Sequence, residues 1–228
     1  MTTKSLIIPA AGSGSRMQRE VPKPYLKLAG DSILEHTVRR FLSVDGLAQV
    51  VIATSQEYLD QANDMLEKVL PDTVAARCVA GGNERQDSIR NALAVLSDVD
   101  LVMIHDAVRP FVEAKHIAEC CRVASEAGAA VLGVPAKDTI KRVDGRRYVE
   151  ETPTRKFLWQ AQTPQVFRTK VILEAFEKAE EDSFSGTDDA SLVEYLGRKV
   201  RMVEGSRSNF KITYPLDLKL ARLLIEKE

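Results

Sequence analysis

The first two-thirds of the chain alternates short apolar, β-branched runs with longer amphipathic stretches, and this alternation limits the fold more than any other feature. The runs predict strands, and the stretches between them predict helices that cover those strands. Strands that are apolar almost throughout are typical of a parallel sheet buried on both faces, so we predict an α/β fold with a mostly parallel sheet. Strands are expected at 5–9, 49–54, 74–79, 100–105 and 129–134, and helices at 32–44, 56–69, 84–96 and 114–127.

The composition fits a single domain over residues 1–228, because 44% of its residues are hydrophobic and can bury a core. A formal net charge of -1 argues against a general polyanion binder, so we expect no nucleic-acid partner.

There is no signal-peptide core and no run of 18 apolar residues, so no membrane association is expected. The cysteines, Cys78, Cys120 and Cys121, are odd in number and lack zinc-site spacing, which predicts reduced thiols in a cytoplasmic protein.

The alternation breaks after Pro135. Residues 137–152 have no helical stripe, and Asp144-Gly145 is a strong hairpin signal between strand-like flanks. A polar two-stranded hairpin is marginal alone in water. We therefore predict that 137–152 is a protruding β-arm that lies on another surface, either this chain's or a partner's, and that it is the segment through which the chain would form an oligomer.

The rest of the chain returns to mixed elements. Ser32 and Glu35, which open the first predicted helix, form a capping-box pair. Thr187 is the expected N-cap of a later helix, and Pro215 fits the first turn of the last one. Further strands are expected near 157–161, 199–203 and 210–213, with a helix at 169–180.

A glycine-rich loop, P-A-A-G-S-G-S-R-M at residues 9–17, follows the first apolar run, and Lys23 comes next between two prolines. Glycines let backbone N–H groups approach phosphate oxygens, and the charges of Arg16 and Lys23 suit a polyphosphate that gains charge during a reaction. The loop is not the dinucleotide fingerprint, since Met17 stands at its third glycine, nor a Walker A sequence. We predict a nucleoside triphosphate site; the alternative is a tight turn with two solvated cations.

The segment H-D-A-V-R-P at 105–110 follows another apolar strand. Ligands in open α/β sheets gather beyond the carboxyl ends of strands, and a carboxylate there suits Mg²⁺. Asp106 is therefore the predicted metal ligand, with a helix N-cap as the alternative. His105 is expected to be a hydrogen-bonded structural histidine, and Arg109 to meet either substrate or Asp106.

The segment G-G-N-E-R-Q-D-S at 81–88 follows the third predicted strand. Its glycines free the backbone to bond a base edge, and Asn83 and Ser88 add donors and acceptors. A Gly-Gly turn with Asn83 as N-cap explains the segment nearly as well. Two further basic residues, Arg155 and Lys211, would be exposed surface charges if nothing else were known.

Together these segments resemble the 2-C-methyl-D-erythritol 4-phosphate cytidylyltransferases of the non-mevalonate isoprenoid pathway. The resemblance covers nearly the whole chain in the family's order. It lies in the strings P-A-A-G-x-G-x-R-M, P-K-x-Y, G-G-x-E-R-x-D-S, H-D-A-x-R-P, D-T-x-K-R, L-W-x-A-x-T-P-Q, T-D-[DE]-A-S and N-x-K-[IV]-T. One such string would be weak, whereas the ordered set is highly specific.

The resemblance implies a Rossmann-like nucleotidyltransferase fold and a reaction in which CTP and methylerythritol phosphate give the CDP-linked alcohol and pyrophosphate. It implies Mg²⁺ as cofactor, with Mn²⁺ as an alternative, and a two-fold partner whose site the arm reaches. The implied catalytic residues are Arg16 and Lys23 at the α-phosphorus, and Arg155 and Lys211 at the substrate phosphate. The implied nucleotide-binding residues are Ala10, Ala11, Gly12, Gly14, Gly82, Asn83 and Ser88. The implied substrate-binding residues are Ala107, Arg109, Thr139, Thr163 and Thr187.

The chain departs from the family pattern at a few positions. Pro24 stands where Gln is usual, which should stiffen the Lys23 loop. Asn83 replaces a common Asp, so a carboxylate bond to the cytosine amino group is lost while a backbone contact would survive. Ser208 precedes Asn209 where an acidic residue is frequent.

Four other functions stay open. A ribitol 5-phosphate cytidylyltransferase and a sugar-1-phosphate nucleotidyltransferase would share the fold; the Lys211 segment argues against the latter. A nucleotide-binding regulatory module without activity would have no use for a second phosphate site. A sugar transferase is disfavoured because no D-x-D metal motif follows the fourth strand.

Overall fold

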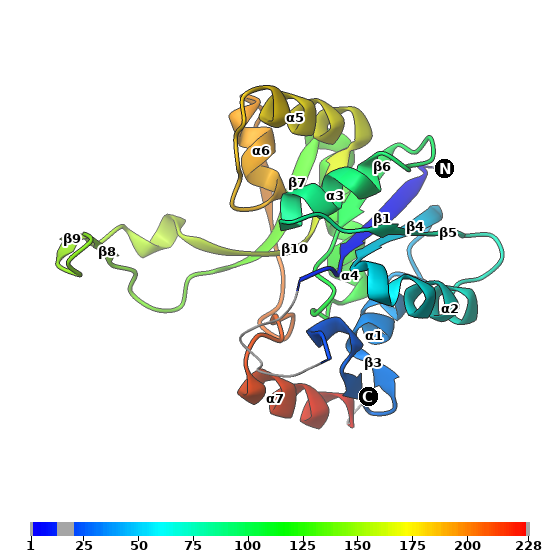
Figure 1. The fold of residues 1–228 in the computed structure, drawn as a ribbon. Helices are drawn as coiled ribbons and strands as arrows, with labels where there is room; N and C mark the ends of the chain where they lie inside the picture. Colours follow the sequence, from blue (N-terminus) through cyan, green and yellow to red (C-terminus); the bar gives the residue numbers. More distant parts are fainter. Residues whose placement is uncertain (1, 13–20, 227–228) are drawn as a thin grey trace.

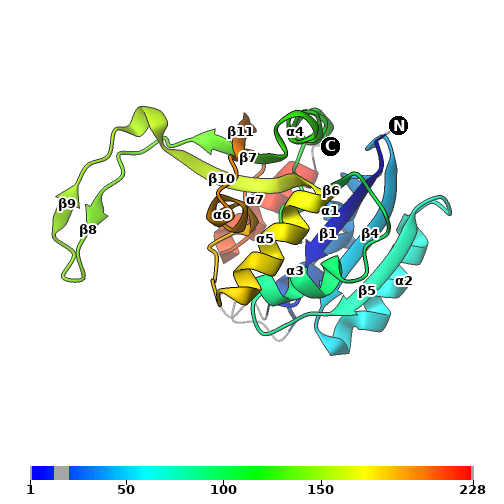
Figure 2. The same ribbon diagram turned by 90° about the horizontal axis from the view of Figure 1, so that it is seen from above.

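The computed structural model describes residues 2–12 and 21–226, and in this part of the chain seven strands form one sheet. The sheet order is β11-β7-β10-β6-β1-β4-β5 (Figures 1 and 2). The strands are β1 (Lys4–Pro9), β4 (Leu47–Thr54), β5 (Ala75–Ala80), β6 (Leu101–Ile104), β7 (Ala129–Pro135), β10 (Trp159–Arg168) and β11 (Arg201–Glu204). Two short ladders lie outside it, β2 (Lys27–Leu28) with β3 (Asp31–Ser32) and β8 (Arg142–Val143) with β9 (Val149–Glu151).

The sheet is mostly parallel, as predicted. β1 pairs in parallel with β4 and β6, β4 with β5, and β7 with β11, whereas β10 runs antiparallel between β6 and β7. The carboxyl ends of β1, β4, β5 and β6 therefore share one edge of the sheet. That edge is where an open α/β sheet binds its ligands.

Helices cover both faces of the sheet, because their apolar stripes pack onto the buried strands. One face carries α1 (Ile33–Arg39), α2 (Leu59–Val69) and α4 (Ala114–Ala127), and the other carries α3 (Arg85–Leu93), α5 (Thr169–Glu181) and α6 (Asp189–Tyr195). The C-terminal α7 (Pro215–Ile225) packs with the β2–β3 ladder in a smaller third cluster. None of the helices described here is long and apolar enough to cross a membrane.

Local capping corrects several predicted helix boundaries. Ser32 caps α1 through the N–H of Glu35, as expected, but the carboxylate of Glu35 pairs with Arg39. The N-cap of α6 is Asp188 rather than Thr187, because the Asp188 carboxylate accepts from the N–H of Ser191. The expected helices over 32–44, 56–69 and 84–96 are shorter, since 3-10 turns and loops take up their ends.

The N-cap of α3 is Glu84, so the alternative that gave this role to Asn83 is wrong. The side chains of Glu84 and Asp87 form a capping box. The Asp87 carboxylate accepts from the backbone N–H of Glu84 at 3.1 Å. Asn83 therefore belongs to the loop before the helix.

Two predicted strands differ from the structure. The strand expected at 157–161 is the ten-residue β10, which continues past Pro164 because its ladder is irregular between Ala161 and Gln165. The segment 210–213 is not a strand. Its backbone forms a hydrogen bond from the N–H of Ile212 to the carbonyl of Val108, but no strand ladder. This segment crosses the carboxyl edge of the sheet instead of pairing with it.

The predicted arm is present as a hairpin that extends away from the sheet (Figures 1 and 2). Its two short strands, β8 and β9, are joined by a turn in which the Asp144 carboxylate accepts from the N–H groups of Arg146 and Tyr148. Tyr148 is 71% exposed, and Val149 is also exposed. A small ladder with solvent on its apolar side chains cannot be stable by hydrophobic burial within this chain.

Candidate active site

A pocket of about 530 Å³ opens at the carboxyl edge of the sheet, between the loops that follow β1, β5 and β6. Most of the predicted site residues meet there. The pocket is lined by Ala10, Ala11, Gly12, Lys23, Gly82, Asn83, Ser88, Asp106, Ala107 and Lys211, together with Pro9, Pro24, Glu84, Arg85 and Val108. Two predicted residues, Gly14 and Arg16, lie outside the described residues.

The two glycine loops are pressed together at Gly81. A Cβ atom at Gly81 would collide with the Cβ of Ala11, and one at Gly82 would collide with the Cβ of Asp87. Glycine is therefore required for the loop after β5 to lie against the loop after β1. This contact makes one pocket from two loops that are distant in the sequence.

Ser88 holds the loop after β5 through its hydroxyl. Its side chain is buried, and its hydroxyl accepts from the N–H of Gly82 and donates to the carbonyl of Glu84, both at 3.1 Å. Ser88 therefore holds the loop in place, and both of these bonds engage its hydroxyl.

Lys23 is held in a short 3-10 turn, η2 (Lys23–Tyr25), that begins after Pro22. The turn is anchored by Tyr25, whose hydroxyl lies 2.6 Å from Oγ1 of Thr54 at the end of β4, and whose ring stacks on Tyr58 with centroids 4.2 Å apart. Burial raises the pKa of Tyr25 to about 12, so the phenol stays neutral. Lys23 itself is only 8% exposed and lines the pocket.

Asp106 lies at the centre of a group of cations. Its Oδ2 is 3.0 Å from Nε of Arg109 and 3.2 Å from Nζ of Lys211, and its Oδ1 is 3.6 Å from Nε of Arg85. Burial opposes ionisation of this carboxyl, but the charges of Lys211, Arg85 and Arg109 outweigh it and hold the pKa of Asp106 well below its usual range. The group carries a net positive charge suited to a phosphate-bearing ligand.

Arg85 is a site residue that the sequence reasoning missed. Its guanidinium forms two parallel bonds to the buried carboxylate of Asp189, at 3.0 and 2.7 Å. Such a bidentate pair fixes the plane of the guanidinium. The signal was present in the strings G-G-x-E-R and T-D-[DE]-A-S, but nothing in their local patterns shows that the two strings meet.

His105 is structural, as predicted, because both of its ring nitrogens are engaged. Nε2 lies 3.0 Å from the carbonyl of Arg109, which can only accept, so Nε2 carries the proton and Nδ1 accepts from the Thr163 hydroxyl at 3.0 Å. Complete burial lowers the pKa of His105 to about 4. The Thr163 hydroxyl also accepts from the backbone N–H of Asp106, so it serves the framework beneath the pocket.

Three predicted residues lie outside this group in the described structure. Thr139 and Arg155 are exposed at the base of the arm, where the Arg155 guanidinium donates to the carbonyl of Lys137 at 2.7 Å. Thr187 is exposed just before the Asp188 cap of α6. The single chain therefore does not bring Thr139 and Arg155 into contact with Lys23 or Asp106.

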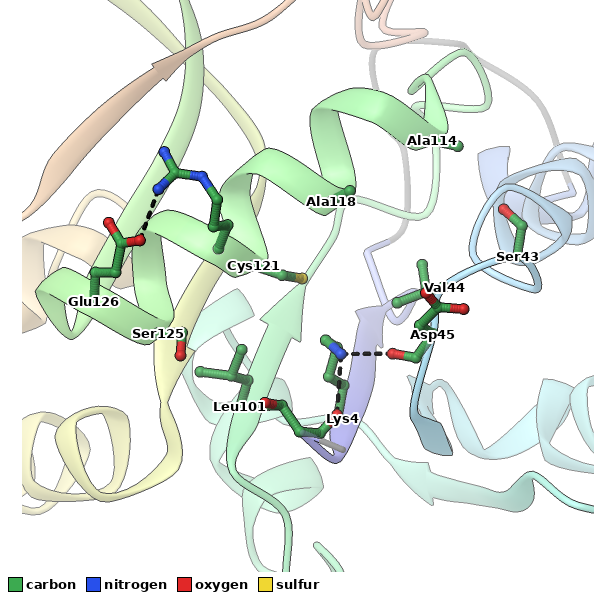
Figure 3. A pocket seen from close by; sticks show the side chains of 12 residues that line it. Lys4, Ser43, Val44, Asp45, Leu101, Ala114, Ala118, Cys121, Ser125 and Glu126 are labelled. Carbon is green, nitrogen blue, oxygen red and sulfur yellow. Dashed lines mark hydrogen bonds and ion pairs between the residues drawn. The ribbon is translucent and has the colours of Figure 1, made fainter.

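A second pocket, of about 410 Å³, lies near the opposite edge of the sheet (Figure 3). Its lysine, Lys4, donates to the backbone carbonyls of Thr2 and Asp45. Its thiol, Cys121, is buried, and burial raises the pKa of that thiol to about 11 despite the nearby charge of Lys4. Cys121, Cys78 and Cys120 are free, as predicted, and neither a strong nucleophile nor a disulfide marks this pocket as a reaction site.

The donor set at the carboxyl edge fits a divalent cation only in part. No group of three or more metal-ligating side chains occurs within residues 2–12 and 21–226. Asp106 offers one carboxylate, and its Oδ1 lies 3.6 Å from Nε of Arg85. Mg²⁺ commonly takes one or two carboxylates and draws its other ligands from substrate phosphates and water. The residues thus fit a Mg²⁺ ion that arrives with a polyphosphate.

Comparisons with known proteins show which family this chain resembles over its length. The family model of 2-C-methyl-D-erythritol 4-phosphate cytidylyltransferase (IspD) matches residues 5–227. Proteins with that name from Syntrophus aciditrophicus and Halalkalibacterium halodurans are each 44% identical, over 97% and 98% of this chain and 95% and 98% of their own lengths.

Solved structures give the same result. The 4-diphosphocytidyl-2C-methyl-D-erythritol synthase of Anaerococcus prevotii has a TM-score of 0.88 at 32% identity, over 99% of this chain and 96% of its own. The cytidylyltransferase of Thermus thermophilus has a TM-score of 0.80 at 34% identity, over 99% and 100%. Because sequence and fold agree over nearly the full length, this chain belongs to the 2-C-methyl-D-erythritol 4-phosphate cytidylyltransferase family.

Proposed function

We propose that this protein transfers CMP from CTP to 2-C-methyl-D-erythritol 4-phosphate in isoprenoid precursor biosynthesis. An oxygen of the substrate phosphate attacks the α-phosphorus of CTP. The bond from that phosphorus to the bridging oxygen breaks, and pyrophosphate leaves with the electron pair. The products are 4-diphosphocytidyl-2-C-methyl-D-erythritol and pyrophosphate.

The observation that carries the proposal is that Lys23 and Lys211 line one pocket with two glycine loops. The nucleophile is already ionised near neutral pH, so the reaction needs positioning and charge stabilisation more than a general base. This agrees with a His105 that is neutral and engaged at both nitrogens. Lys23, together with Arg16 seven residues earlier in the sequence, would stabilise charge that grows on the α-phosphoryl group.

Lys211 and Arg109 would receive the phosphate of the second substrate. Both contact Asp106 at distances of 3.2 and 3.0 Å, so they are already held at the edge of the pocket. The backbone of residues 81–83 would read the cytosine edge, since Gly82 leaves the main chain open to a planar base.

Mg²⁺ is the cofactor we propose, with Asp106 as its one protein carboxylate. When bound, the ion would neutralise phosphate oxygens of CTP. Arg85 and Lys211 would keep Asp106 ionised for this role. Loss of turnover on removing divalent cations with a chelator, and its return with Mg²⁺ or Mn²⁺, is the expected result.

A homodimer formed through the arm is also part of the proposal. The exposed apolar side chains of Tyr148 and Val149 need a surface to cover them, and a second copy would supply one. Arg155 and Thr139, at the base of the arm, would then reach the partner's site. We propose the cytoplasm as the compartment, in keeping with three free thiols.

The test is pyrophosphate release from CTP and Mg²⁺, with methylerythritol phosphate and ribitol 5-phosphate offered separately and a reaction without acceptor as the blank. Release with methylerythritol phosphate alone is expected. Release with ribitol 5-phosphate alone would overturn the substrate. If neither acceptor leads to pyrophosphate release although CTP binds measurably, the proposed activity is overturned in favour of a nucleotide-binding regulatory module.

A further inference from the structure

We propose that Asn209 is a positioning residue that fixes Lys211 at the active site by tying the segment 205–213 to β10. The role rests on the proposed function, because it concerns the placement of a cation for the second substrate. The sequence pattern around N-F-K-I-T does not distinguish a structural asparagine from one that faces substrate. The contacts of the Asn209 side chain in the structure show that it is structural.

The side chain of Asn209 is completely buried, and its amide joins two parts of the chain. Nδ2 donates to the carbonyl of Thr163 at 2.9 Å and to Oε1 of Gln162 at 3.2 Å. Gln162 in turn donates from Nε2 to the carbonyl of Ser206 at 2.9 Å. Two side-chain amides thus connect the segment 205–213 to the irregular part of β10.

The backbone of Asn209 links this connection to the charged group in the pocket. Its carbonyl accepts from Nη1 of Arg109 at 2.8 Å, while Nε of the same guanidinium donates to Asp106. Two residues further along, Nζ of Lys211 lies 3.2 Å from Asp106. Asn209 therefore anchors one side of Lys211, and the bond from the N–H of Ile212 to the carbonyl of Val108 anchors the other.

This arrangement explains how an irregular segment can place a catalytic lysine. Residues 210–213 form no ladder, so no regular backbone pairing holds Lys211. The Lys211 side chain is 40% exposed, and its own packing cannot fix it. The buried amide supplies the missing constraint, since two donors of one rigid group must meet two acceptors of β10 at once.

The test is a double-mutant cycle between Asn209→Ala and Lys211→Ala, followed by steady-state kinetics with both substrates. Removing the amide should lower kcat/KM for methylerythritol phosphate by about 10- to 100-fold, as expected for a misplaced catalytic group. In the Lys211→Ala background the same change should cost less than about 3-fold, because the residue it positions is absent. Equal losses in both backgrounds, or no loss in either, would overturn the proposal.

A second readout does not depend on the reaction. Lys211 paired with Asp106 should react slowly with acetic anhydride, and Asn209→Ala should raise its rate of acetylation, measured by mass spectrometry against the other lysines. An unchanged rate in folded protein would count against Asn209 even if the wild type proved inactive. Inactivity of the wild type would instead refute the proposed function.

Two further variants keep the test decisive. Asn209→Ser retains one donor and is the replacement if Asn209→Ala does not fold; an intermediate loss of kcat/KM and an intermediate acetylation rate are expected. Ser208→Ala changes the exposed neighbour, whose hydroxyl bonds to that of Ser206, and should leave both readouts unchanged. A Ser208 effect as large as that of Asn209 would show that any change in the segment suffices, and would contradict a specific role for the amide.

Discussion

The ammonium of Lys211 lies 3.2 Å from Oδ2 of Asp106, which joins the segment after β11 to the loop after β6. Arg109 shares the same carboxylate oxygen, and Arg85 approaches the other. Asp106 thus holds two cations at the mouth of the pocket, and a third, Arg85, is held beside it by Asp189. A phosphate that enters would compete with Asp106 for these cations and bind where they are already gathered.

The Asp106→Asn variant should be both less stable and inactive, because Asp106 holds the cations of the pocket in place. Without the carboxylate, Arg85, Arg109 and Lys211 repel one another, and we expect a loss of about 3 kcal/mol in the free energy of unfolding. Urea unfolding in the absence of ligand measures this loss. A free energy of unfolding equal to that of the wild type would contradict this account.

Lys23→Ala should lower turnover by about 10²–10³-fold while changing the KM for CTP little, because a donor that acts on developing charge is felt mainly in kcat. Steady-state kinetics with varied CTP measures both. Lys27→Ala, which removes an exposed lysine of β2, is the matched control and should behave as wild type. A raised KM with normal turnover would assign Lys23 to ground-state binding instead.

The pair of Arg85 and Asp189 should be intolerant of even a conservative change. Arg85→Lys cannot satisfy both carboxylate oxygens, and we expect a loss of about 3 kcal/mol in denaturant unfolding. Arg90→Lys provides the control on the same helix, since its pairs with Asp87 and Glu180 are exposed and should be worth less than about 1 kcal/mol. A similar stability for the two variants would mean that the bidentate geometry contributes little.

His105 should make the stability of the fold sensitive to acid. Its pKa is about 4 in the folded protein and 6.5 ordinarily, so the unfolded chain binds more protons between these values. Its contribution, roughly 3 kcal/mol at most, is complete above about pH 6.5 and is lost as the pH falls toward 4. His105→Gln should flatten this dependence in urea unfolding at pH 5 and 7.5; an unchanged slope would assign the acid sensitivity to other groups.

If the arm forms the homodimer, mixtures of two inactive variants should regain activity. If Arg155 serves the partner's site, then Lys23→Ala and Arg155→Ala copies mixed under exchanging conditions should form hybrid dimers with one complete site. Pyrophosphate release should recover to roughly a quarter of wild type. Activity no greater than the sum of the separate variants would place Arg155 in the site of its own chain.

Much of the site could be predicted from the sequence. The loops after β1, β5 and β6 were found because strands and helices alternate with regular periodicity, and parallel strands bring their carboxyl ends to one edge. The sequence alone therefore predicts that the loops of Gly12, Gly82 and Asp106 lie together. The protruding hairpin followed in the same way from Asp144-Gly145 and from the loss of a helical stripe.

Only the tertiary structure decided how side chains in distant segments pair. The two bonds from Arg85 to Asp189, the engagement of the Thr163 hydroxyl by His105, and the buried amide of Asn209 all depend on packing between elements that no local pattern relates. The same reason explains why β10 continues past Pro164 and why 210–213 is not a strand. Short-range periodicity reflects which residues face the core, whereas the partner of a buried polar group is set by the three-dimensional arrangement that must satisfy it.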